Sequence, residues 1–286
     1  MALTPVTYIP TGGDFTPAVA NGPHDDLKAR DEEIYALVSA TSGDPGIYTG
    51  YHSKVIIDCN EDETLSILEN SEVSSDDGNK ILIASTDLTV DITLSGVGGL
   101  DTGAEAVDTW YYIWMIGGIS SSAGLLSLSS TAPTMPSGYT YKRLIGAVKN
   151  GGDGHFERFL QQGNSVVYYD DDLAIISTSN PATTLTTVSG SDYLPDGLNI
   201  RQALIKIYME VSWAATDGSR CWTRGGIVNE NLRSNVISDQ DPSVSEYWQP
   251  VDVLEEFDYR VEDIGWLGNW EGYAFTIIVQ GYKFPL

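Results

Sequence analysis

Basic residues are scarce in this chain of 286 residues. It has 15 lysines and arginines against 40 aspartates and glutamates, so its formal net charge is −25 at pH 7. A protein that binds DNA or RNA neutralises backbone phosphates with basic side chains, and this acidic surface would repel them. An anionic membrane face would repel it in the same way. The charge therefore predicts that the protein binds neither nucleic acid nor a membrane.

Cysteine is also rare. Cys59 and Cys221 are the only two, so no disulfide framework holds this fold, and we expect two buried thiols in the reduced state. No apolar run approaches the length of about 18 residues that a transmembrane helix needs. Residues 1–5 lack the basic and apolar segments of a signal peptide. We therefore expect a soluble protein that is made in a cytoplasm.

Histidine is scarce as well, which limits the catalysis the chain can carry out. His24, His52 and His155 are the only three, none lies in a nucleophile–base motif, and no G-x-S-x-G elbow occurs. Two thiols and three scattered imidazoles provide no spaced pair of zinc ligands. The sequence predicts no catalytic residue, no cofactor and no metal site.

Two acidic stretches come closest to a cation site. Five residues occupy positions 1, 3, 5, 9 and 12 of the EF-hand calcium loop pattern: Asp58, Asn60, Asp62, Ser66 and Glu69. However, Glu63 stands where that loop needs glycine, and the flanking residues 54–57 and 64–68 are typical of strands. We interpret the stretch as the acidic tip of a hairpin. The run 170–172 is interpreted as solvated acid, with a structural Ca²⁺ as the alternative.

The remaining pattern is that of a β protein. From residue 48 onward, short β-branched or aromatic runs alternate with Gly, Pro and Asp turns, and no βαβ alternation occurs. Residues 76–79 and 151–154 are typical of hairpin turns. We predict an all-β fold, with two β-sandwich or jelly-roll-like domains after an N-terminal arm and one short α-helix. The predicted boundaries are 1–46 for the arm and helix, 47–169 for a trunk domain and 170–286 for a C-terminal domain.

The N-terminal segment differs from the rest. Prolines and glycines in residues 1–22 favour an extended arm, and Pro23 with two following aspartates favours a helix over 23–39. The helix would carry one apolar stripe, formed by Leu27, Ile34, Leu37 and Val38. A lone helix of this length is marginal in water, so the stripe must pack on the β region or on copies of itself. These four residues are the candidate oligomer contacts.

Residues 110–116 form the most apolar of the predicted strands. Trp110, Tyr112 and Trp114 alternate with Tyr111, Ile113 and Met115, so large side chains extend from both faces. Such a strand lies between two layers. The layers can be two sheets, a sheet and a covering loop, or two subunits.

Residues 99–168 resemble a module that recurs in predicted phage tail, fibre and head-fibre proteins. The segments that carry the resemblance are Gly99-Leu100-Asp101-Thr102-Gly103, 108–116, Gly124-Leu125-Leu126-Ser127 with the following 128–143, 145–148 and 161–168. The resemblance implies a structural protein of the virion with a β fold, assembled in the host bacterial cytoplasm. It brings no catalytic residue and does not specify tail, collar or head.

These expectations combine into a tail-fibre or spike subunit. Residues 1–46 would attach to other virion proteins, and residues 170–286 would adhere to the host surface. We expect a homotrimer, whose three copies of −25 sum to −75 and must be held by apolar contacts. The alternatives are a capsid decoration or head-fibre protein and a polysaccharide depolymerase.

One neighbourhood bears on host recognition. Trp266 and Trp270 are candidate glycan contacts, because aromatic faces stack on sugars. The acidic residues around them give the depolymerase alternative its candidate carboxylates, which are Glu255, Glu256, Asp258 and Asp263. A third interpretation places the two tryptophans in the core of the C-terminal domain.

Overall fold

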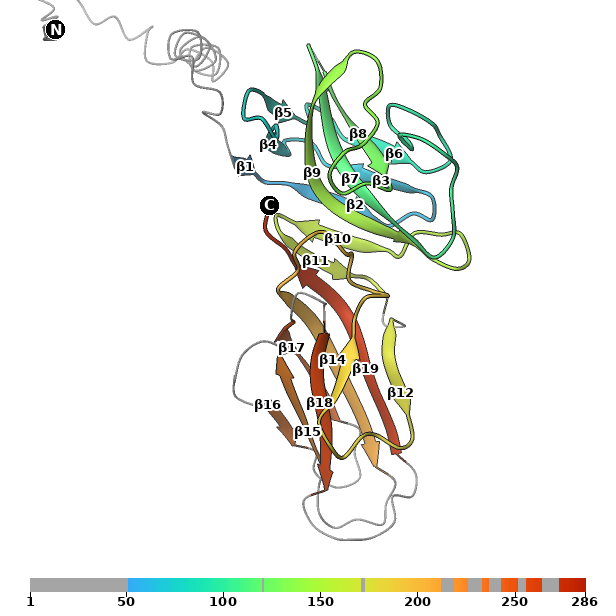
Figure 1. The fold of residues 1–286 in the computed structure, drawn as a ribbon, viewed down its shortest axis with the longest axis vertical. Coiled ribbons are helices and arrows are strands. Elements are labelled where there is room, and N and C mark those ends of the chain that lie inside the picture. The colour runs from blue at the N-terminus through green and yellow to red at the C-terminus, as the bar shows by residue number, and fades with distance from the viewer. Residues whose placement is uncertain are drawn as a thin grey trace, which may run out of the picture. The chain divides into compact units, whose positions relative to one another are not determined.

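The computed structural model describes residues 51–119, 121–170, 173–211, 219–225, 233–236, 243–251, 256–263 and 273–286. These residues belong to the second of two units into which the chain divides, residues 48–286. Every regular element among them is a β-strand (Figure 1), which confirms the predicted all-β class. The predicted arm, the helix over 23–39 and its stripe Leu27, Ile34, Leu37 and Val38 lie outside the described residues.

The strands of the described residues form four sheets. The strands are β1 (His52–Ser53), β2 (Ile56–Cys59), β3 (Thr64–Ile67), β4 (Glu72–Ser74), β5 (Ile81–Ile83), β6 (Leu88–Asp91), β7 (Thr109–Gly118), β8 (Ser122–Ser127), β9 (Tyr139–Asn150), β10 (Phe159–Gln162), β11 (Ser165–Tyr168), β12 (Ala174–Thr178), β13 (Thr186–Ser189), β14 (Gln202–Val211), β15 (Ser219–Gly225), β16 (Arg233–Val236), β17 (Ser243–Pro250), β18 (Glu256–Asp263) and β19 (Tyr273–Lys283). The sheet orders are β1-β4-β5, β8-β7-β9, β13-β18-β15-β16 and β17-β14-β19-β11-β10-β2-β3-β6, with β12 paired to β19.

The acidic hairpin is present as predicted. β2 and β3 pair antiparallel with Ile57 opposite Ile67 and Asp58 opposite Ser66. Side chains alternate between buried and half-buried along both strands, as the period of two requires. The stretch with the partial calcium pattern is therefore a hairpin whose flanks are strands.

Both predicted tight turns are present, but the strands that follow them pair differently. Residues 76–79 connect β4 and β5, which pair as a hairpin. Residues 151–154 also form a turn, with a single bridge between Asn150 and Phe156. The N–H of Glu157 also donates to the carbonyl oxygen of Lys149 at 2.9 Å, so the predicted hairpin-type turn is present locally. Beyond this local pairing, β9 and β10 belong to different sheets. The chain turns at 151–154 and crosses from the three-stranded to the nine-stranded sheet.

The nine-stranded sheet runs through the predicted boundary at residue 170. β19 pairs with β14 along its whole length. It also pairs with β12 over Phe275–Ile278 and with β11 at its end, where Val166 lies opposite Tyr282. Gly281 is required at this crossing, because a Cβ there would lie 2.1 Å from the carbonyl oxygen of Val166. The backbone of β19 thus joins residues on both sides of 170, and the division into two domains stays a prediction.

Candidate functional site

β7 is the central strand of its sheet, and one face of it packs on the nine-stranded sheet. Gly124 lies opposite Met115, and a Cβ on Gly124 would approach Val90 of β6 to 2.2 Å. Gly146 lies opposite Ile113, and a Cβ there would approach Gln161 of β10 to 2.5 Å. Directly opposed residues share a face, so Ile113 and Met115 point into the space between the two sheets. Glycine on the neighbouring strands lets the sheets approach at these points.

The other face of β7 is covered by loops. The indole Nε1 of Trp114 donates a hydrogen bond to the carbonyl oxygen of Ser129 at 3.0 Å. The hydroxyl of Tyr112 donates to the carbonyl oxygen of Asp196. Residues 111–116 are all buried, which confirms the predicted burial of both faces. Of the three arrangements foreseen, the structure has a sheet on one side and covering loops on the other.

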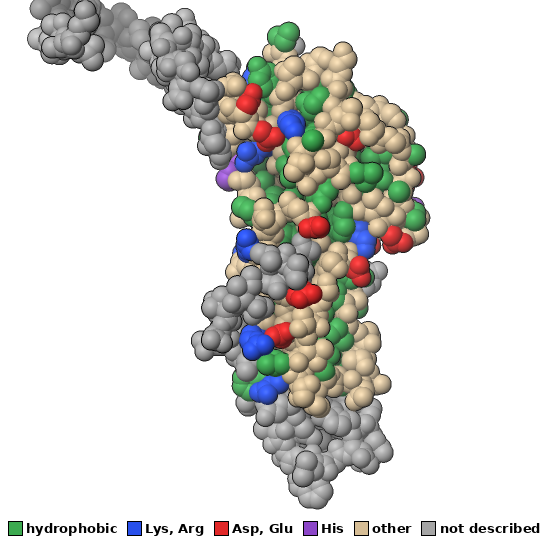
Figure 2. All heavy atoms as spheres, viewed as in Figure 1, with side chains coloured by type: hydrophobic (Ala, Val, Ile, Leu, Met, Phe, Trp, Pro, Cys, Tyr) green, Lys and Arg blue, Asp and Glu red, His purple; other side chains and the backbone are tan. Residues whose placement is uncertain are grey.

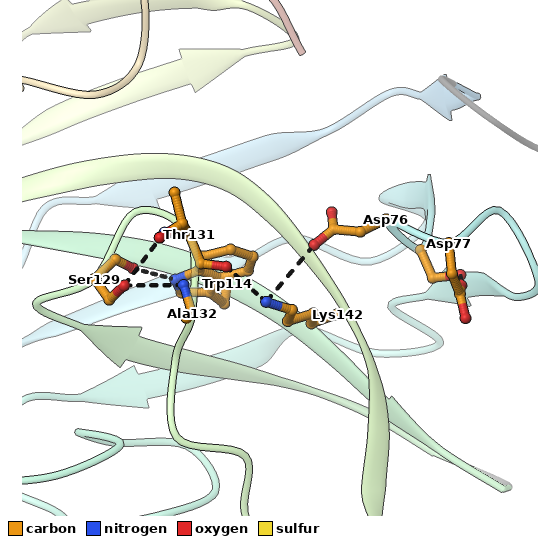
Figure 3. Close-up of polar contacts among 8 residues, drawn as sticks. Asp76, Asp77, Trp114, Ser129, Thr131, Ala132 and Lys142 are labelled. Carbon is orange, nitrogen blue, oxygen red and sulfur yellow. Dashed lines mark hydrogen bonds and ion pairs between the residues drawn. The ribbon is translucent and has the colours of Figure 1, made fainter.

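A set of polar contacts holds the loop 128–138 over Trp114 (Figure 3). Lys142 makes three of these contacts. Its Nζ lies 4.8 Å from the centre of the Trp114 ring and donates a hydrogen bond to the carbonyl oxygen of Thr131 at 2.7 Å. The same Nζ forms an ion pair with Asp76 Oδ2 at 3.9 Å. The Oγ of Ser129 accepts from the backbone N–H of Ala132 at 2.9 Å and that of Thr131 at 3.3 Å. We call these residues, Asp76, Trp114, Ser129, Thr131 and Lys142, the polar lock.

Asp101 fixes the same loop from another direction. Its Oδ2 accepts a hydrogen bond from Ser127 Oγ at 2.8 Å and one from the backbone N–H of Thr134 at 2.7 Å. Ser127 is buried, so its hydroxyl needs this partner. The carboxylate thus joins the end of β8 to the middle of the loop 128–138.

Residues 94–101 close the outer edge of β8. The N–H of Leu126 donates to the carbonyl oxygen of Gly99, and the N–H of Asp101 donates to that of Leu126, both at 2.8 Å. A Cβ on Gly99 would lie 2.4 Å from the carbonyl oxygen of Leu94, so only glycine fits there. An exposed strand edge offers free backbone groups to other chains, and this segment removes that opportunity for β8.

Asp76 of the polar lock and the neighbouring Asp77 have pKa shifts of opposite sign. Burial raises the pKa of Asp76 above its ordinary value, against the opposing charges of Lys142 and Arg143. Burial also acts to raise the pKa of Asp77, but hydrogen bonds from Ser75 and Asn79 lower it overall. The groups of the polar lock contact one another, so the arrangement can hold the loop 128–138 in one position.

The structure describes only part of the predicted glycan neighbourhood. Trp266, Trp270 and Glu255 lie outside the described residues, as does the side chain of Asp263. Glu256 lies opposite Ser189 in the pairing of β18 with β13. The role of Trp266 and Trp270 as glycan contacts therefore stays a prediction.

Asp258 of this neighbourhood is part of an ion pair. It accepts hydrogen bonds from Arg224 Nε at 3.0 Å and from Thr187 Oγ1 at 2.8 Å, and it forms a salt bridge with Arg224. Burial acts to raise the pKa of Asp258, but these hydrogen bonds and the charge of Arg224 lower it overall. A general acid in glycoside hydrolysis needs a raised pKa instead. The lowered pKa of Asp258 therefore argues against this carboxylate as a general acid.

The two acidic stretches considered as cation sites make contacts within the protein. Asp58 accepts a hydrogen bond from the Tyr169 hydroxyl at 3.0 Å, and Asp170 pairs with Arg158 through bonds of 2.8 and 3.1 Å. Within the described ranges, no group of three or more His, Cys, Asp or Glu side chains is arranged to hold a metal ion. A search of the same ranges found no helix with the length and apolar character to cross a membrane.

The two cysteines are unpaired and buried, as predicted. Burial raises the pKa of both Cys59 and Cys221 to about 12. The thiolate is the reactive form, so both side chains are inert at neutral pH.

Four of the five residues of the polar lock, all but Asp76, lie within the segment 99–168 that carries the resemblance, but sequence reasoning gave them no role. Lys142, Ser129 and Asp101 are separated along the chain, and their meeting depends on how β7, β8 and β9 pair. One local signal was available: serines directly after an apolar strand often accept hydrogen bonds from nearby backbone N–H groups. Ser129 does this for Thr131 and Ala132.

Comparison with known proteins adds no relative. No protein-family model matches the sequence, and no curated protein is significantly similar to it.

Proposed function

We propose that this chain is a structural protein of a bacteriophage virion, a tail-fibre or spike subunit that works as a homotrimer. One observation carries the proposal: the side chains of the recurring module are used to fix its own fold. Trp114, Lys142 and Asp101 each contact the loop 128–138. A repeated building block needs such internal rigidity, whereas an enzyme needs reactive groups free to meet a substrate.

The proposal includes the arrangement of sheets as two sandwiches, over 47–169 and 170–286. In the first, Gly124 of β8 meets Val90 of β6 across two sheets. In the second, Tyr259 of β18 stacks on Phe275 of β19 with ring centres 5.4 Å apart. Residues 1–46 would attach the chain to other virion proteins, and residues 170–286 would contact a host-surface glycan, with Trp266 and Trp270 as its stacking residues.

The capsid-decoration alternative makes the same use of a rigid module, so the test must locate the protein. Purified particles of the source phage are reconstructed by cryo-electron microscopy and labelled with an antibody fragment against residues 170–286. Label at the tail, with this region pointing outward, is the expected result. Label spread over the capsid lattice would establish a decoration protein instead, and absence of the chain from purified particles would overturn the virion proposal altogether.

A further inference from the structure

Residues 173–191 form a surface without charge. They include β12, β13 and the connection between them, and they contain no Asp, Glu, Lys or Arg in a chain of net charge −25. Most of their side chains are exposed or half-buried, and Leu185 is 38% exposed. In Figure 2 the area over β12 is tan and green, without red or blue side chains. We call residues 173–191 the neutral surface.

The neutral surface carries two open strand edges. Among the described strands, β12 pairs only with β19, and β13 pairs only with β18. Each therefore ends its sheet and leaves one side of its backbone unpaired by another strand. The edge strands of the module are treated differently: residues 94–101 cover β8, and backbone N–H groups of Asp76 and Glu157 bond to β9.

The edge of β13 lacks most of the features that keep strand edges apart. Natural proteins protect such edges with charged side chains, prolines or bulges. β13 has the sequence Thr-Thr-Val-Ser, with no charge, no proline and no irregularity in its pairing. β12 does have a register shift between Ala174 and Ile176, so its regular edge is limited to Ile176–Thr178. Among the features that the described residues show, only the short length of β13, four residues, protects this edge.

We propose that the neutral surface is a contact between copies of this chain, with β13 of one copy pairing with an open edge strand of another. Electrostatics selects the occupant: two copies of −25 each can approach with least repulsion where neither presents carboxylates. Acidic residues border the surface at Asp170 and Asp192 and at Glu256, which lies opposite Ser189 on the paired strand β18. Asp258, opposite Thr187, is neutralised by Arg224. An uncharged centre inside a polar rim is the usual composition of a protein interface.

Two different edges also fit the proposed symmetry. A three-fold ring requires a head-to-tail contact, in which one patch of a copy meets a different patch of the next. β13 against β12 of the next copy is such a contact. The inference rests on the homo-oligomeric part of the proposed function and identifies the surface that forms it.

The test adds charge to the neutral surface of the full chain. Thr183 and Leu185 are exposed, so the double substitution Thr183→Asp/Leu185→Asp leaves the core unchanged and places like charges in every copy of the contact. We expect the dissociation constant of the assembly, from sedimentation velocity, to rise at least about tenfold. The neutral variant Thr183→Asn/Leu185→Asn should keep the assembly. Leu128→Asp, at an exposed leucine outside the surface, serves as the matched control.

The outcomes separate this inference from the function it rests on. An oligomer whose mass is the same in wild type and in the charged variant would overturn the neutral surface as the contact and leave the homo-oligomer standing. A wild-type chain that is a monomer at all concentrations would overturn both. Hydrogen exchange on the wild type gives a second measurement that needs no variant: amides of 186–189 should be protected in the assembly and lose protection on dilution, and equal exchange in both would contradict the contact.

Discussion

The module around β7 and the neutral surface differ in whether their strand edges are covered. In the module, the edge of β8 is covered by residues 94–101, and the loop over β7 is held by Asp101 and the polar lock. In the neutral surface, the edges of β12 and β13 are left without a partner strand among the described strands. The first region completes its hydrogen bonding within one chain, and the second leaves one side of each edge strand unpaired by another described strand.

The difference indicates where each region gains its stability. Trp114 is 1% exposed, so the module buries a large aromatic side chain under its loop without any partner. β13 buries only Val188 of its four residues. We therefore expect changes in the module to alter the free energy of unfolding of a single chain, and changes in the neutral surface to alter assembly.

The largest effect is expected from Trp114→Ala. The substitution removes a buried ring between the sheet and the loop 128–138, and with it the partners of Lys142 and Ser129. Truncation of a buried tryptophan costs about 3–5 kcal/mol of unfolding free energy. Urea denaturation of wild type and variant measures the change. Thr140→Ala, at an exposed position of β9, is the control and should stay within about 0.5 kcal/mol of wild type. A loss below 1 kcal/mol for Trp114→Ala would show that the module does not depend on its lock.

Asp101→Ala is expected to have the next largest effect. It removes the acceptor of two hydrogen bonds and leaves the buried Ser127 hydroxyl without it. An unsatisfied buried group of this kind costs about 1–3 kcal/mol. Limited proteolysis should then cut the loop 128–138 faster than in wild type. Asp101→Asn retains one oxygen acceptor and should recover part of the loss, whereas equal losses in both variants would argue against the two hydrogen bonds as the cause.

Much of the fold followed from local patterns. The strands that flank the acidic hairpin tip, β2 and β3, were predicted from sequence. The large side chains on both faces of β7 were predicted as well, because successive side chains of a strand point to opposite faces. The breaker residues 76–79 likewise form the expected turn between β4 and β5. These features depend on residues that are neighbours along the chain.

The features that were missed depend on distant residues. β19 joins β11 because Gly281 allows close approach to Val166, a contact between segments more than a hundred positions apart. The turn at 151–154 carries the chain to a different sheet because β10 finds partners in β2 and β11. No periodicity within a segment encodes which strand it will pair with, and the polar lock forms only after that choice is made.

Tyr112→Phe tests the contact between the module and the loop 190–200. The phenol donates to the carbonyl oxygen of Asp196, so its loss should cost about 0.5–1.5 kcal/mol and speed hydrogen exchange of residues 192–198. Tyr168→Phe removes a similar bond, 2.9 Å long, to the carbonyl oxygen of Tyr193 and should act on the same loop. Tyr139→Phe is the control. Faster exchange in the loop 128–138 instead would show that Tyr112 supports the lock and not the second loop.

The smallest effect compares two carboxylates with opposite pKa shifts. The folded pKa of Asp258 lies below the ordinary 3.8, so its ionised form stabilises the fold. This contribution to stability is complete above about pH 4 and is lost as the pH falls through the folded pKa. The folded pKa of Asp76 is raised, so its ionised form is disfavoured by folding, and stability falls as the pH rises from 3.8 through that folded pKa.

Asp258→Asn should therefore make stability less sensitive to acid, and Asp76→Asn should remove a loss that develops above pH 3.8. Each pH-dependent difference should stay below about 1 kcal/mol, because Lys142 and Arg224 remain partly exposed. Thermal unfolding from pH 2.5 to 7 of the two variants and wild type measures both slopes. If the two carboxylates changed stability with pH in the same direction, burial of Asp76 would not outweigh the charge of Lys142. The polar lock and the Arg224–Asp258 pair would then differ in geometry alone.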